Sequence, residues 1–204
     1  MADRFIKGTL ILTAAGLMVK ILASVNRIFL SRLLGGEGIG LYQLAYPLFN
    51  LLTGIAAAGI PAAMSLFVSQ WAAKKEWGTV RHIFRVSMVL FVTMGLAWAA
   101  FALLMIPHLF SGGIIKDGRA LLPMLSCVPA LALAVPLAGL RGYFQGFQEM
   151  KPTAVSQILE QFVRVAVMLA LAVMLLPRGL EVAAAGAIFG AAPGTACGLL
   201  LLIW

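Results

Sequence analysis

The sequence predicts an all-α integral membrane protein, folded as a bundle of six transmembrane helices. Of its 204 residues, 62% are hydrophobic and only 11% are charged, whereas a soluble domain averages roughly 45–50% apolar and about 25% charged residues. Residues 86–109 and 120–140 contain no Asp, Glu, Lys or Arg, and each run is long enough to cross the bilayer core as a helix. Both runs are continuously apolar, so they lack the alternation of membrane β-strands.

Six helices are expected, at residues 8–34, 41–71, 79–107, 120–147, 152–176 and 181–204. The first contains Lys20 and Arg27, which a cleavable signal peptide would not carry in its apolar core, so we expect it to be retained. It ends in Gly-Gly-Glu-Gly, a typical helix stop, and Pro152 opens the fifth helix. Short connections make successive helices antiparallel neighbours. The last helix reaches Trp204 without a polar exit, so we expect further helices to follow.

Proline and glycine interrupt three of these helices. They occur in the second helix (Pro47, Gly54, Gly59, Pro61), the fourth (Pro129, Pro136) and the sixth (Pro193-Gly194). Membrane helices tolerate both residue types, so the interruptions have a purely structural interpretation. They are equally suited to act as hinges in alternating access.

The distribution of Lys and Arg predicts the orientation, because cytoplasmic flanks of membrane helices hold an excess of positive charge. One side collects eight such residues and the other four: Arg4, Lys7, Lys74, Lys75, Arg81, Arg85, Arg141 and Lys151 against Arg32, Lys116, Arg119 and Arg178. We therefore expect a cytoplasmic N-terminus. The net charge of +8 is explained by this bias and by anionic lipid of the inner leaflet. No basic segment interleaved with aromatics predicts nucleic-acid binding.

Polar residues form stripes on single helix faces, and charged groups at membrane depth usually face a bundle interior or a wet cavity. In the first helix the spacing i, i+4, i+7, i+11 places one such stripe, Lys20, Ser24, Arg27 and Ser31, on one face. Arg27 has a second interpretation, since its long side chain could extend to the outer interface.

The fifth helix repeats the pattern with Gln157, Glu160, Gln161 and Arg164. Glu160 and Arg164 are four residues apart and able to pair, so they form either a structural ion pair or part of a substrate site. The second helix adds Tyr42, Tyr46, Asn50 and Thr53. The fourth ends with Arg141, Gln145 and Gln148, which we expect near the cytoplasmic surface, where such residues often contact head groups.

The stripes hold at least three cations against one carboxylate, Glu160. A cavity lined by them would be positive and would suit a phosphate or diphosphate. No catalytic constellation, metal-ligand spacing or phosphate-binding glycine loop is present in the sequence, so we expect neither an enzyme nor a cofactor. Cys127 and Cys197 lie in apolar segments and are poor disulfide candidates.

Several segments carry a family resemblance: "KGTLILTAAGLMVKILASVNRIFLSRLLGGEGIGLYQLAYPLFNLL", "AGIPAAMSLFVS" and "LRGYFQGFQEMKPTAVSQILEQFVRV". They resemble the stage V sporulation protein B group of polysaccharide-biosynthesis membrane proteins, within the multidrug/oligosaccharidyl-lipid/polysaccharide flippase superfamily. The resemblance implies that residues 1–204 are the N-terminal lobe of a two-lobe transporter in a bacterial cytoplasmic membrane. The second lobe is absent from this sequence and would be the partner of the first.

The resemblance also implies a function. It favours a flippase or exporter of an undecaprenyl-diphosphate-linked saccharide for envelope biogenesis, working by alternating access, with Na⁺ or H⁺ as a coupling ion. The polar stripes supply the candidate substrate-binding residues, which are Lys20, Ser24, Arg27, Asn50, Arg141, Glu160 and Arg164. The alternatives are a cation-coupled drug exporter of the same superfamily, which would need acidic cavity residues, and a non-transporting scaffold in envelope or spore assembly.

Overall fold

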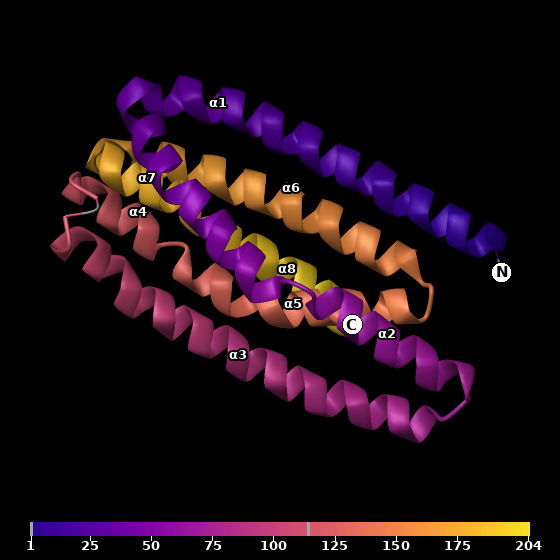
Figure 1. The fold of residues 1–204 in the computed structure, drawn as a ribbon. Coiled ribbons are helices and arrows are strands. Elements are labelled where there is room, and N and C mark those ends of the chain that lie inside the picture. The colour runs from indigo at the N-terminus through magenta and orange to yellow at the C-terminus, as the bar shows by residue number, and fades with distance from the viewer. Residues whose placement is uncertain (1, 114) are drawn as a thin grey trace.

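The structure, a computed structural model, describes residues 2–113 and 115–204, which form helices and no strands. The helices lie nearly side by side in an elongated bundle (Figure 1). In chain order they are α1 (Ala2–Ala57), α2 (Ile60–Ala73), α3 (Trp77–Ser111), η1 (Gly118–Ala120), α4 (Leu121–Leu125), α5 (Val128–Gly146), α6 (Met150–Leu175), η2 (Leu176–Arg178), α7 (Leu180–Phe189) and α8 (Ala191–Ile203).

Five segments of the described residues are long and apolar enough to cross a membrane, one fewer than the sequence predicts. The difference arises in the first segment, Lys7–Ala73, which joins the first two predicted helices. These two predicted helices meet at Gly35, whose φ of 66° and ψ of −173° are not helical. A residue with a Cβ rarely adopts this backbone conformation, which explains the glycine. Figure 1 shows α1 reversing direction in this region and returning along the bundle.

Three further helices are broken close to the predicted interruptions. The second predicted helix breaks before α2, where Pro61 occupies the first turn, and the fourth breaks before α5, where Pro129 does the same. The sixth divides at Gly190 into α7 and α8. Proline fits a first helical turn because its missing N–H would have no partner there. Whether these breaks move during function remains a prediction.

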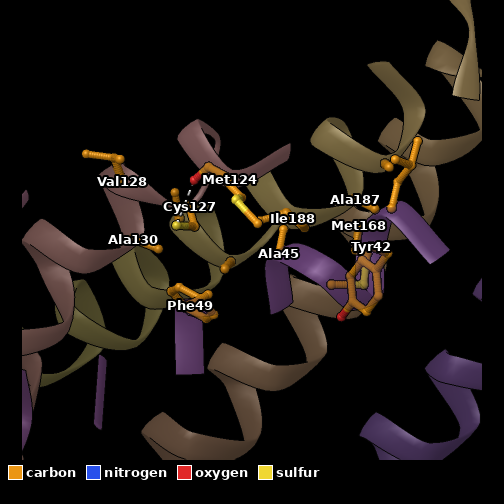
Figure 2. Packing of buried hydrophobic residues seen from close by; sticks show 14 of the residues in the cluster. Tyr42, Ala45, Phe49, Met124, Cys127, Val128, Ala130, Met168, Ala187 and Ile188 are labelled. Atoms are coloured by element: carbon orange, nitrogen blue, oxygen red, sulfur yellow. Dashed lines mark hydrogen bonds between the residues drawn. The ribbon is translucent and has the colours of Figure 1, made fainter. Parts of the chain in front are cut away.

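Helices α5, α6 and α8 form the centre of the bundle, with α1 against α6 and α7 on one side and α2 and α3 against α5 on the other. The largest buried cluster joins α1 to α3, α4, α5, α6, α7 and α8, and it includes Tyr42, Phe49, Met124, Met168 and Ile188, which Figure 2 labels. Lipid is as apolar as these side chains, so the contacts stabilise the bundle by close packing rather than by exclusion of water.

Small residues let the central helices approach closely. Gly194 and Gly198 of α8 face α6, and a Cβ on Gly194 would lie 2.8 Å from the Glu160 carbonyl oxygen and 2.9 Å from Cβ of Arg164. This small-xxx-small spacing is typical of membrane helix contacts. Both cysteines are free, and Cys127 Sγ lies 2.9 Å from the carbonyl of Met124 (Figure 2).

Candidate functional site

A cluster of polar side chains lies between α5, α6 and α8, and Glu160 is its centre. The two carboxylate oxygens accept hydrogen bonds from different arginines: Oε2 from Arg141 Nη2 at 2.6 Å, and Oε1 from Arg164 Nη2 at 2.5 Å. Thr195 Oγ1 lies 3.3 Å from Oε1. The side chains of both arginines are 17% exposed and that of Glu160 is 13% exposed. One carboxylate therefore holds two guanidinium groups in a largely dehydrated place.

The cluster continues from Arg141 to the backbone of α8. Arg141 Nη2 also donates to Ser156 Oγ at 3.1 Å, and Ser156 Oγ donates to the carbonyl of Gly198 at 3.1 Å. The close approach of α8 at Gly194 brings Thr195 to Glu160, so packing and hydrogen bonding depend on each other here. We call Arg141, Ser156, Glu160, Arg164 and Thr195 the Glu160 cluster.

Two cavities lie against this cluster. The outer cavity, about 320 Å³, lies between the two halves of α1 and α6, and its polar lining is Ser24, Asn26, Arg27, Tyr42, Gln43, Tyr46, Gln161 and Arg164. The inner cavity, about 250 Å³, lies between α1, α5, α6 and α8, and its polar lining is Thr53, Arg141, Gln145, Gln157, Glu160, Arg164 and Thr195. Arg164 lines both cavities.

The cavities have a net positive lining. The Glu160 cluster contributes two guanidinium groups and one carboxylate, and Arg27 adds a third cation in the outer cavity. Nε of both Arg141 and Arg164 is buried and has no hydrogen-bond partner among the described residues. Buried N–H groups without partners are costly, so these donors are suited to water or an anionic oxygen. Among the described residues no three His, Cys, Asp or Glu side chains gather as metal ligands would.

The structure brings most of the predicted stripe residues to the cavities. All four polar residues of the α6 stripe line one cavity or both, and the predicted pairing of Glu160 with Arg164 is present. Ser24 and Arg27 line the outer cavity, as do Tyr42 and Tyr46, while Thr53 lines the inner one.

Lys20 and Asn50 are both exposed and line neither cavity. The backbone carbonyl of Lys20 accepts a hydrogen bond from Ser24 Oγ at 3.0 Å. Their roles in substrate binding stay predictions.

Two features of the site were not expected from the sequence. The sequence left open whether Arg141 contacts head groups or a substrate, and in the structure Ser156 and Glu160 hold its side chain inside the bundle. Asn26, beside Arg27 in the sequence, is buried, and its Nδ2 lies 2.8 Å from Met168 Sδ of α6. Its Oδ1 has no hydrogen-bond partner among the described residues. An amide within an apolar helix was the signal that could have identified Asn26.

The apolar helices and the enclosed polar cluster define a multi-pass membrane protein with a positive interior. The chain belongs to the polysaccharide biosynthesis protein family, whose model matches residues 5–204. It is similar to three Bacillus subtilis proteins. These are stage V sporulation protein B (37% identical over 198 residues), lipid II flippase MurJ (34% over 213 residues) and the uncharacterized membrane protein YabM (32% over 203 residues).

The matches cover 97%, 99% and 97% of this chain but only 38%, 39% and 36% of the respective relatives. The chain therefore spans less than two fifths of the length of these relatives. No solved structure matches it.

Proposed function

We propose that this chain is the N-terminal lobe, with six membrane passes, of a flippase that moves a polyprenyl-diphosphate-linked saccharide across the bacterial cytoplasmic membrane. The observation that carries the proposal is the position of Arg164, which lines both cavities and shares Glu160 with Arg141. A diphosphate that passes from one cavity to the other would stay close to a positively charged side chain along the whole path. The similarity to a lipid II flippase supports this substrate class.

The chemistry of the cavities suits such a head group. Arginine forms short, charge-assisted hydrogen bonds with phosphate oxygens, and these are about twice as strong as neutral ones. Arg27 and Arg164 line the outer cavity together with hydroxyl and amide groups able to bind sugar hydroxyls. Lys20 lies two turns before Arg27 on α1, so it would extend the positive path toward the N-terminal end of the bundle.

Transport would proceed by alternating access, with a second lobe of the same protein closing the cavities on the open side. The helix breaks before α2, before α5 and between α7 and α8 are the proposed hinges. Arg141 and Arg164 both pair with Glu160, and among the described residues no second carboxylate lines either cavity. This arrangement disfavours a drug exporter that binds cations here; a coupling ion, Na⁺ or H⁺, would bind elsewhere in the complete transporter.

The test is translocation of a labelled lipid-linked precursor in vesicles that contain the full-length protein. Replacing Arg27 or Lys20 by Ala or Glu should slow translocation roughly tenfold or more, because a hydrogen bond to a charged group contributes about 1.5–3 kcal/mol. Lys20→Arg should be tolerated better, since a mobile diphosphate requires positive potential more than one fixed geometry.

Arg32→Gln is the matched control, because Arg32 lines neither cavity and, five residues after Arg27, is on another face of α1 than Lys20 and Arg27. Wild-type translocation rates for the Ala and Glu variants at both positions, at normal expression, would refute the cationic path, and the stripe on α1 would then serve only helix packing.

A further inference from the structure

A third, largely apolar groove lies between α2 and α3, apart from the Glu160 cluster. Phe67 and Trp71 of α2 form one wall, and His82, Ile83 and Val86 of α3 form the other, around about 390 Å³. Phe67 and Trp71 are four residues apart, so they lie on one face of α2. On α3, Val86 is four residues after His82 and three after Ile83, so these side chains also share one side of the helix. Phe67 is 51% exposed and Val86 is 55% exposed. The groove therefore offers an apolar surface that the described residues leave open.

Cations surround the end of this groove at the α2–α3 turn. The Lys74 ammonium lies 4.4 Å from the centroid of the Trp71 ring, a cation–π contact that places it at the groove wall. Lys75 is in the turn itself, and Arg85 is exposed three residues after His82, hence on the same side of α3. Among the described residues none of these three cations is in an ion pair.

The turn contains one carboxylate, and it does not neutralise the cations. Glu76 Oε2 accepts a hydrogen bond from Thr79 Oγ1 at 3.1 Å, within the first turn of α3. Three unpaired cations and one carboxylate leave the mouth of the groove positive. Its complement is an anionic group.

The depth of the groove identifies the rest of the ligand. Phe67 lies six residues before the end of α2 and Val86 nine residues after the start of α3, which corresponds to about 9 Å and about 13 Å along the helices. Lys74 and Lys75, in the turn, therefore lie at the head-group level when Phe67 and Val86 lie among acyl chains. Arg85 is level with Val86, and its long side chain can extend from there toward the head groups. A ligand that fits both parts has a phosphate at one end and a hydrocarbon chain at the other.

We propose that the α2–α3 groove binds an anionic glycerophospholipid. One acyl chain lies along Phe67, Trp71 and Val86, and the phosphate is held by Lys74, Lys75 and Arg85. This site is separate from the cavities of the proposed transport path, and it does not depend on that function. A cation near the membrane surface raises binding of anionic lipid about fivefold, from roughly 1 kcal/mol per charge.

The test uses the fluorescence of Trp71 in the full-length protein, with Trp77, Trp98, Trp204 and any other tryptophan replaced by phenylalanine. The protein is placed in phosphatidylcholine vesicles containing equal fractions of phosphatidylglycerol or phosphatidylcholine brominated in the acyl chain. Bromine quenches tryptophan only at short range, so the two quenching curves give the ratio of the two binding constants. We expect phosphatidylglycerol to be preferred about fivefold or more.

Three variants separate a bound lipid from general attraction to the surface. Lys74→Gln/Arg85→Gln should bring the ratio close to one, and Lys116→Gln, an exposed cation remote in sequence from the groove, should leave it unchanged. Ser87→Phe fills the groove and keeps every cation, so the preference should fall here as well. A ratio near one in the parent protein, an undiminished preference in Ser87→Phe, or an equal loss in Lys116→Gln would overturn the proposal.

Discussion

Replacing Glu160 by glutamine should destabilise the protein more than any other single change in the Glu160 cluster. The carboxylate holds Arg141 at 2.6 Å and Arg164 at 2.5 Å, and all three side chains are less than one fifth exposed. Glutamine keeps the shape and removes the charge, so two guanidinium groups remain close together and uncompensated. Removing one partner of a buried ion pair costs about 3–5 kcal/mol, and we expect a loss of unfolding free energy in that range.

Second-site changes should restore stability in steps, because the uncompensated charge is the cause of the loss. From the Glu160→Gln variant, adding Arg164→Gln leaves one guanidinium without a carboxylate, and adding Arg141→Gln as well leaves none. We therefore expect partial recovery in the double variant and fuller recovery in the triple variant. If Glu160 and Arg164 formed a neutral pair alone, the double variant would already recover fully, but Arg141 in the cluster argues against that.

The measurement is the unfolding free energy in detergent, followed by tryptophan fluorescence during titration with a denaturing detergent. Glu149→Gln is the matched control, since Glu149 is exposed in the α5–α6 connection and should be nearly neutral. Glu160→Gln with unaltered stability would show that the two arginines do not need the carboxylate. Equal instability of the single, double and triple variants would refute the account by charge compensation.

Two other changes test the packing and the orientation. Gly194→Ala should lower the unfolding free energy by about 1–3 kcal/mol, because the added Cβ would lie 2.8 Å from the Glu160 carbonyl oxygen of α6. Gly40→Ala is the control and should have little effect, because nothing lies within 4 Å of the added Cβ. Equal effects of the two changes would contradict the close contact of α6 with α8. A cysteine at Lys75, in a variant without Cys127 and Cys197, should react with an impermeant reagent only from the cytoplasmic side. Labelling only from outside would reverse the predicted topology.

The predicted orientation depends on eight Lys and Arg residues assigned to the cytoplasmic side, and the structure does not place all of them at one end of the bundle. Lys74, Lys75 and Lys151 lie in or beside the α2–α3 and α5–α6 turns, at the end of the bundle that holds the N-terminus (Figure 1). Arg141 was counted with them but lies inside the bundle, and Arg4 lies outside the residues whose side chains are described. The excess of cations at this end persists without these two residues, so the cytoplasmic N-terminus stays our prediction.

The sequence by itself determined the class of protein and the inward face of α6. Long apolar runs have one stable form in lipid, a helix, because each backbone N–H and C=O must find a partner within its own segment. Polar residues at helical spacing share a face in any such helix. The pairing of Glu160 with Arg164 followed for the same reason, since both residues belong to α6.

Only the tertiary structure decided which helices meet at the site. Arg141 reaches Glu160 from α5 and Asn26 reaches Met168 from α1, across 19 and 142 residues of sequence, and no local periodicity encodes such contacts. Helix packing in lipid depends on the fit of small residues such as Gly194 between neighbours. That fit is a property of two surfaces together, and a single segment of sequence specifies only one of them.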